Sequence, residues 1–200
     1  MFNFLFAILL KHPHSWIELR CLDSNQHIIN DFKTNFKKNI YFFSAQSVLK
    51  LFNGTHNGKP SGIMIPIPQY PLYSATIAEF GLQQCGYYLD EDNKWALDTS
   101  ELERAYNECC SYSNPRVLVV INPGNPTGQV LSRENIENII RFAHKKKLYI
   151  IADEVYQDNI YDKNCCFHSF KKIITEMGEP YCHMEVASFM SISKGTLYKL

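Results

Sequence analysis

The central part of the chain alternates between short buried β-type runs and an amphipathic helical segment. Residues 116–121 (RVLVVI) are apolar and rich in β-branched residues without polar alternation, as expected for a parallel strand covered on both faces. Residues 132–147 follow with apolar side chains at helical spacing, Ser132 as a good N-cap and three lysines at the end. Residues 148–152 (LYIIA) resemble a second buried strand. This order predicts a βαβ crossover, and therefore an α/β fold with a doubly wound, mostly parallel sheet.

The same alternation extends to both sides of this unit. We expect further strands at 62–67, 83–89 and 185–189 and a helix at 71–80. Asp98 and Ser100, each with a glutamate three residues later, both match the capping-box pattern before a helix that ends near residue 109. Two hundred residues with 46% apolar content suffice for one globular core and rarely for two.

Polar residues follow three of the expected strands. The loop 122–128 (NPGNPTG) follows the first, Asp153, Glu154 and Tyr156 follow the second, and the SxSK segment with Ser191 and Lys194 follows the third. Each group alone is common as turn chemistry, a helix cap or a solvated charge. Because ligands bind outside the carboxyl ends of the strands in open α/β sheets, we expect these groups to converge on one edge of the sheet.

This combination of side chains suits pyridoxal phosphate. That cofactor needs a lysine amine for a Schiff base, an acidic partner for its ring nitrogen, donors to its ring hydroxyl, and an anion site for its phosphate. The sequence contains neither GxGxxG nor GxxxxGK[ST], which argues against dinucleotide binding and P-loop chemistry. No metal site is expected.

Six segments together resemble the alanine aminotransferase branch of the class I/II aminotransferases of fold type I. They are IPIPQYPLYSA (65–75), YYLDEDNKWALD (87–98), VINPGNPTGQV (120–130), IADEVYQDNIY (151–161), FHSFKK (167–172) and ASFMSISKG (187–195). The resemblance implies that residues 44–200 form part of the large, cofactor-binding domain of such an enzyme. Residues 1–43 are an N-terminal segment of unknown character.

The resemblance also implies a role for individual residues. Lys194 would be the Schiff-base lysine that binds the cofactor and moves the substrate proton. Asp153 would pair with the ring nitrogen, and Asn125 and Tyr156 would bond the 3′ oxygen of the ring.

Two further cofactor contacts are implied. Tyr70 would stack on the ring, and Ser191 would contact the phosphate. The implied reaction converts L-alanine and 2-oxoglutarate into pyruvate and L-glutamate in a ping-pong mechanism. An amino acid, a 2-oxo acid and a second copy of the chain in a homodimer are the implied partners.

Two departures from the family pattern bear on activity. Residues 40–52 (IYFFSAQSVLKLF) lack the glycine-led phosphate loop that the family has there, and six residues follow Lys194 where the family continues with arginine-bearing segments. We therefore expect a truncated chain with little transaminase activity alone. The alternatives are a non-catalytic fragment or pseudoenzyme that binds a full-length aminotransferase, and a different class I/II aminotransferase.

Net charge and cysteine content bear on the binding partners and on the cellular compartment. Lys+Arg and Asp+Glu are both 20, so nothing indicates nucleic-acid binding. Seven cysteines without a CxxC motif indicate reduced thiols rather than a disulfide framework or a zinc site, and hence a cytoplasmic location with a mitochondrial one as the alternative. The apolar residues 1–10 are too short to span a membrane and lack a basic start, which favours a buried strand or a non-native leader over a signal peptide.

Overall fold

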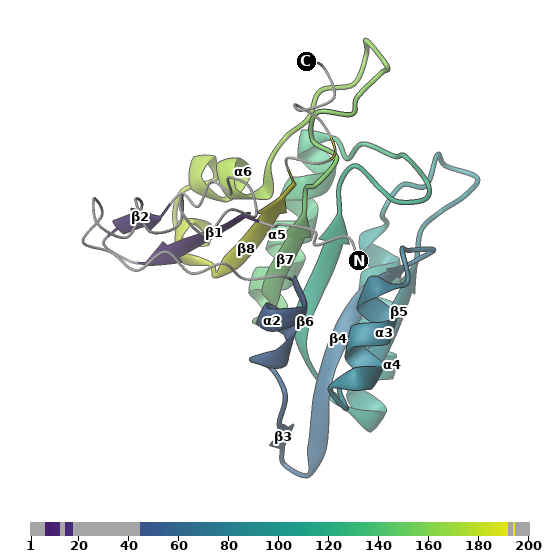
Figure 1. The fold of residues 1–200 in the computed structure, drawn as a ribbon, viewed down its shortest axis with the longest axis vertical. Coiled ribbons are helices and arrows are strands. Elements are labelled where there is room, and N and C mark those ends of the chain that lie inside the picture. The colour runs from purple at the N-terminus through teal and green to yellow at the C-terminus, as the bar shows by residue number, and fades with distance from the viewer. Residues whose placement is uncertain (1–6, 13–14, 18–44, 192–193, 195–200) are drawn as a thin grey trace, which may run out of the picture.

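The computed structural model describes residues 7–12, 15–17, 45–191 and 194, and an eight-stranded sheet runs through them (Figure 1). In chain order the strands are β1 (Ala7–His12), β2 (Ser15–Ile17), β3 (Thr55–His56), β4 (Lys59–Ile67), β5 (Gln83–Tyr88), β6 (Asn114–Ile121), β7 (Tyr149–Asp153) and β8 (Val186–Met190).

The centre of the sheet is parallel. Strands β5, β4, β6, β7 and β8 lie side by side in that order and all pair in parallel. Strand β1 pairs antiparallel with β8, β2 pairs antiparallel with β1, and β3 forms a hairpin with the start of β4. The predicted mostly parallel sheet is confirmed. A strand is also confirmed within the apolar N-terminal run, because β1 begins at Ala7.

Helices cover both faces of the sheet. They are α2 (Ala45–Lys50), α3 (Leu72–Glu79), α4 (Thr99–Tyr112), α5 (Arg133–Lys146), α6 (Phe170–Glu176) and the 3₁₀ helix η1 (Tyr181–His183). Buried side chains of α4, α5 and α6 form one core cluster with one face of the sheet, and those of α2 and α3 form a second cluster with the other face. No helix in the described part of the chain is long and apolar enough to cross a membrane.

Strand β6 shows why its sequence does not alternate. Leu118 and Val120 belong to the first core cluster, whereas Val117, Val119 and Ile121 belong to the second. A strand buried on both faces needs apolar residues at every position, as the sequence predicted.

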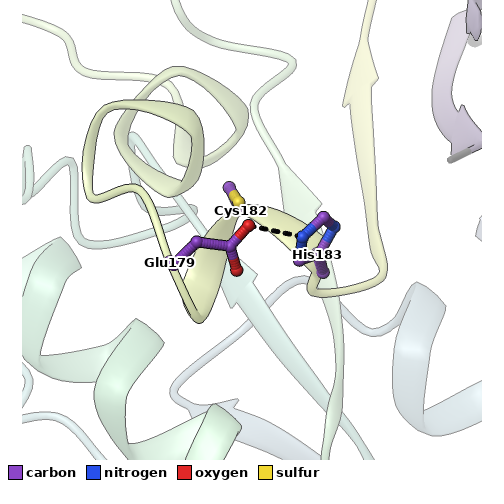
Figure 2. A group of neighbouring side chains, drawn as sticks. All are labelled: Glu179, Cys182 and His183. Carbon is purple, nitrogen blue, oxygen red and sulfur yellow. Dashed lines mark hydrogen bonds and ion pairs between the residues drawn. The ribbon is translucent and has the colours of Figure 1, made fainter. Parts of the chain in front are cut away.

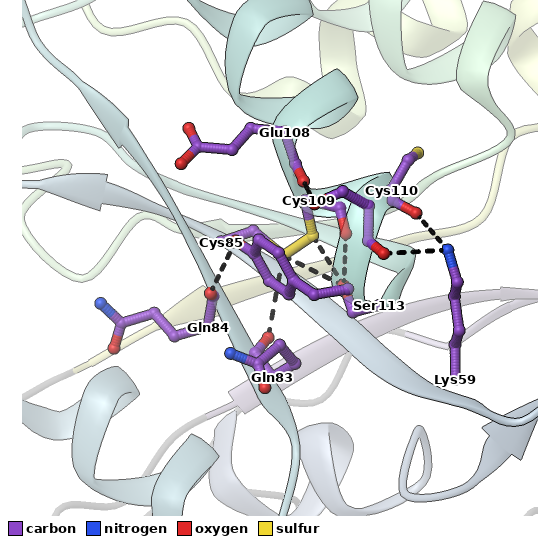
Figure 3. The surroundings of a disulfide bond; sticks show 10 residues. Lys59, Gln83, Gln84, Cys85, Glu108, Cys109, Cys110 and Ser113 are labelled. Atoms are coloured by element: carbon purple, nitrogen blue, oxygen red, sulfur yellow. Dashed lines mark hydrogen bonds between the residues drawn. A yellow bond between two sulfur atoms is a disulfide. The ribbon is translucent and has the colours of Figure 1, made fainter.

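Local signals fix the helix ends near the expected places. The Ser132 hydroxyl accepts a hydrogen bond from the Asn135 amide at 3.1 Å, and the Asp98 carboxylate accepts one from the Ser100 amide at 2.9 Å. Helix α4 extends to Tyr112, three residues beyond the expected end. There Lys59 of β4 donates to the Cys110 and Ser111 carbonyls at 2.6 and 3.2 Å (Figure 3).

Helix α6 was not predicted, because its seven residues give too short a periodic pattern.

The expectation that the cysteines are all reduced is wrong for one pair. Cys85 of β5 and Cys109 of α4 form a buried disulfide, with their Cα atoms 5.5 Å apart (Figure 3). A side chain at Gly62 of β4 would collide with both sulfur atoms and with the Ser113 hydroxyl, so the glycine makes room for the bond. The two cysteines lie 24 residues apart, and only the packing of α4 on the sheet brings them together.

We predict that reduction of the Cys85–Cys109 bond lowers the free energy of unfolding by about 3.5 kcal/mol, because the bond closes a loop between residues 24 positions apart in the unfolded chain. Chemical unfolding with and without reductant measures the difference, and peptide mapping without reductant should recover a linked Cys85–Cys109 pair. Cys110→Ala, at a neighbouring free thiol, is the control that keeps the effect of reductant unchanged. Full thiol labelling of both cysteines in the unreduced protein would contradict the prediction.

Candidate active site

The carboxyl ends of three neighbouring strands lie in register. Ile121 of β6 pairs with Asp153 of β7, and Asp153 pairs with Phe189 of β8. Backbone hydrogen bonds continue this row past the strands, from Asn122 N to the Asp153 carbonyl at 2.9 Å and from Glu154 N to the Phe189 carbonyl at 2.8 Å. The segments that follow β6, β7 and β8 therefore start from one edge of the sheet, which we call the strand-end rim (Figure 1).

Asp153 is the buried carboxylate of this rim. Its Oδ2 accepts a hydrogen bond from the Tyr73 hydroxyl of α3 at 2.8 Å, while its Oδ1 is buried and has no hydrogen-bond partner among the described residues. Burial raises the pKa of the Asp153 carboxyl, and the Tyr73 hydroxyl and the nearby Val155 backbone N–H oppose that rise. Burial and the nearby carboxylate also raise the pKa of Tyr73, which keeps its hydroxyl protonated as the donor. Oδ1 of Asp153 can therefore accept a hydrogen bond from a ligand.

Asn125 and Tyr156 meet beside the rim. The Asn125 side-chain amide donates to the Tyr156 hydroxyl oxygen at 3.3 Å, although 31 residues separate them, and both side chains are half-buried. The Tyr156 hydroxyl hydrogen is not used in this bond, because the oxygen acts as the acceptor. The pair can therefore donate to an oxygen atom of a ligand.

The loop that carries Asn125 is held by its own polar groups. The buried Asn122 side-chain oxygen accepts from the Leu131 amide at 3.0 Å, and Gly124 N donates to the Gln129 carbonyl at 2.9 Å. A side chain at Gly124 would collide with the Gln129 side chain. The asparagines and glycines of this NPGNPTG segment therefore set its path, in agreement with their expected turn chemistry.

The remaining predicted site residues occupy three places. Tyr70 follows β4, on the other side of β6 from β7, and its ring is 53% exposed. Ser191 directly follows β8 and is buried, and Lys194 is half-buried three residues further on. Residues 192, 193 and 195 of the SISKG segment lie outside the described residues. The same holds for residues 40–44, so the expected loss of the phosphate loop falls mostly outside them, and the helix beyond it begins at Ala45.

Glu154 was expected at the strand-end rim, but its carboxylate points to β8 and the start of α6 instead. Its buried carboxylate accepts hydrogen bonds from the hydroxyls of Ser188 and Ser169, the latter at 3.0 Å, and from the Phe170 amide at 2.7 Å. Burial raises the pKa of Glu154 to about 7, against the effect of these hydrogen bonds. Glu154 joins β7, β8 and the start of α6. Neither this role nor the Tyr73 contact has a local sequence signal, since the partners come from other elements.

With this geometry established, comparison with known proteins identifies the class. The family model described as aminotransferase class I and II matches residues 33–196. The chain therefore belongs to the class I and II aminotransferases.

Curated relatives narrow the resemblance to one branch. Alanine aminotransferase 1 of Bos taurus is 58% identical over 150 residues, which cover 74% of this chain and 30% of that protein. Alanine aminotransferase 2 of Xenopus laevis is 55% identical over 163 residues, which cover 78% of this chain and 30% of that protein. A probable mitochondrial alanine aminotransferase of Dictyostelium discoideum is 51% identical over 153 residues, which cover 76% of this chain and 28% of that protein. The chain spans about 30% of the length of these relatives, and its alanine aminotransferase resemblance is confirmed.

Solved structures agree with the fold. An aminotransferase from Escherichia coli matches with a TM-score of 0.60 and 28% identity, over 74% of this chain and 32% of that one. N-succinyldiaminopimelate aminotransferase from Mycobacterium tuberculosis matches with a TM-score of 0.60 and 27% identity, over 75% of this chain and 35% of that one. The predicted α/β fold, a partial fold-type I large domain, is confirmed.

We predict a pH-dependent stability contribution from Glu154. Its folded-state pKa of about 7 lies above the ordinary value of 4.5, so the folded state binds the proton more tightly. The resulting stability is complete below about pH 4.5 and is lost as the pH rises through about 7, a difference of about 3 kcal/mol. Glu154→Gln should remove this change, whereas Glu134→Gln, at an exposed position on α5, should retain it. Urea unfolding at several pH values measures both, and parallel curves for wild type and Glu154→Gln would refute the prediction.

Proposed function

We propose that this chain supplies the pyridoxal-phosphate-binding part of an alanine aminotransferase site. The observation that carries the proposal is the buried Oδ1 of Asp153, an acceptor without a partner among the described residues, at the carboxyl end of β7. Its position agrees with the rule for ligand sites in open α/β sheets. The alanine aminotransferases that match the chain at 51–58% identity support the choice of reaction.

The described residues fit this cofactor in chemical kind. A protonated ring nitrogen is a cationic donor, which suits the buried Asp153 carboxylate, one oxygen of which has no hydrogen-bond partner among the described residues. The ring oxygen of the cofactor needs donors, which suits the Asn125–Tyr156 pair. Tyr70 is 53% exposed, which leaves its ring accessible for stacking, and Ser191, directly after β8, would contact the phosphate through its hydroxyl.

Tyr73 acts through Asp153 in this proposal. Its hydroxyl holds Oδ2 at 2.8 Å and so orients the carboxylate with Oδ1 available. The bound cofactor supplies an electron sink for the negative charge that develops at the substrate Cα. Lys194 would hold the cofactor, and its Nζ, once the substrate amine has displaced it, would take up the proton that leaves this carbon and pass it to the cofactor.

The described arginines favour low activity for the chain alone. Arg104, Arg133 and Arg141 are paired with glutamates on helix surfaces, and Arg116 lies near the amino end of β6, away from the rim. None of these four therefore offers a free guanidinium for the carboxylate of an amino acid at the rim. Without such a bidentate clamp the substrate is poorly oriented. This observation also supports a second candidate, a non-catalytic partner of a full-length aminotransferase.

Further assignments belong to the same proposal. Residues 44–200 are assigned to the cofactor-binding domain, and the family suggests a homodimer acting on an amino acid and a 2-oxo acid. A cytoplasmic location rests on the four cysteines outside the disulfide among the described residues, whereas the Cys85–Cys109 bond counts against a reducing compartment. The mitochondrial name of the Dictyostelium relative supplies the alternative.

We predict that the chain forms a covalent adduct with pyridoxal phosphate at Lys194. After borohydride reduction, peptide mass spectrometry should find the adduct in wild type and in Lys163→Ala, an exposed control, but not in Lys194→Ala. Asp153→Asn should weaken cofactor binding by about tenfold or more, because a charge-assisted hydrogen bond becomes a neutral one. Asp92→Asn, an exposed control, should bind as wild type does. An adduct that is spread over several lysines, or unaffected binding in Asp153→Asn, would contradict the proposal.

We predict little alanine-dependent pyruvate formation by the purified chain loaded with the cofactor and 2-oxoglutarate. A coupled assay for pyruvate measures it, with a full-length alanine aminotransferase as the reference. Turnover close to that of the reference enzyme would show that a carboxylate clamp is present after all. Co-purification of the inactive chain with a full-length aminotransferase would favour the second candidate.

A further inference from the structure

Three metal-ligating side chains meet on the turn that follows α6 (Figure 2). Glu179 Oε1 lies 2.6 Å from His183 Nε2, and the ligand atoms of Glu179, Cys182 and His183 all lie within 4.8 Å of one another. We call these residues the η1 cluster. It precedes the amino end of β8, whereas the strand-end rim lies at the carboxyl end of that strand. The cluster is therefore separate from the candidate active site.

The backbone presents the three side chains on one side of a single turn. Cys182 and His183 belong to η1, and Glu179 lies two residues before it, so the three residues are close along the chain. Cys182 N donates to the Gly178 carbonyl and Met184 N to the Tyr181 carbonyl, both at 2.8 Å. The turn thus has a defined backbone path before any ligand is bound.

Packing also anchors this turn to the core. Tyr181, together with Met177 and Met184, packs against the buried cluster under α5 and α6. The Tyr181 ring meets the His144 ring of α5 edge to face, with centroids 5.1 Å apart. The apolar side chains of the turn therefore face inward, while the Glu179 and His183 side chains are 70% and 68% exposed.

The donor set matches a borderline-soft divalent cation. Thiolate, imidazole and carboxylate are the three ligand types of protein zinc sites, and together they carry two negative charges when the thiol and the acid are ionised. Bond lengths of about 2.0–2.3 Å place the ligand atoms of a tetrahedral zinc ion roughly 3.3–3.8 Å apart. The present separations of 2.6 Å to at most 4.8 Å bracket these values. The Glu179 and His183 side chains are exposed, and the ion pair between them contributes little that would resist their rearrangement around an ion.

We propose that Glu179, Cys182 and His183 bind a zinc ion, with the fourth position open to water or to another ligand. Three protein ligands and one open position are typical of exchangeable or reactive zinc rather than of closed structural sites. The absence of a CxxC pattern hid this site from the sequence, because two of its three ligands are adjacent and the third is a glutamate.

Titration of the whole chain with Zn²⁺ against a chromophoric chelator tests the proposal. We expect one ion to bind per chain at this cluster, and Cys182→Ser, His183→Gln and Glu179→Gln each to weaken its binding roughly tenfold or more. Cys166→Ser, which removes an exposed free thiol elsewhere, is the matched control and should bind as wild type does.

Cobalt substitution gives a readout that depends on the thiolate itself. Co²⁺ bound to wild type or to Cys166→Ser should show a sulfur-to-metal charge-transfer band, and Cys182→Ser should lack it. The substitutions at the exposed Glu179 and His183 keep the test valid if Cys182→Ser alone proves unstable in thermal unfolding. Failure of wild type to compete with the chelator for Zn²⁺, or equal losses in Cys166→Ser and the cluster variants, would overturn the proposal. Neither readout involves pyridoxal phosphate, so the outcome is independent of the proposed function.

Discussion

The parallel pairing of β6, β7 and β8 is the constraint on which the candidate active site depends. Because Ile121, Asp153 and Phe189 share one register row, three segments of unlike sequence start from the same edge. Burial of both sheet faces holds that register, since a slip by one residue would exchange the side chains of the two cores. The residues of the candidate site are thus positioned mainly by apolar packing between the sheet and its helices.

The sequence predicted the parts of the fold whose signals are local and strong. Strand β6 and helix α5 were recovered because an unbroken apolar run and a capped amphipathic segment each have few alternative structures. The rim followed from them, because strand ends in a parallel sheet are ordered by the fold class alone. Asn125 and Tyr156 were assigned from the family resemblance, and their contact depends on loops too irregular for periodicity to describe.

Contacts between distant elements could not be predicted in the same way. The Tyr73–Asp153 hydrogen bond joins residues 80 positions apart, and the Cys85–Cys109 bond depends on how α4 lies across β5. The pairing of β1 with β8 joins opposite ends of the described chain, and no local pattern specifies such a partner. In each case the information resides in packing between elements and not within one element.

The two consecutive carboxylates at the end of β7 show how the site and the core are coupled. Successive side chains of a strand point to opposite faces, so Asp153 meets Tyr73 of α3 on one face while Glu154 meets the start of α6 on the other. Each carboxylate is buried, and burial raises the pKa of both. Glu154 offsets this cost with three donors, whereas one oxygen of Asp153 has no hydrogen-bond partner among the described residues. That difference separates a structural carboxylate from one suited to a cationic ligand, although the two residues are neighbours in the sequence.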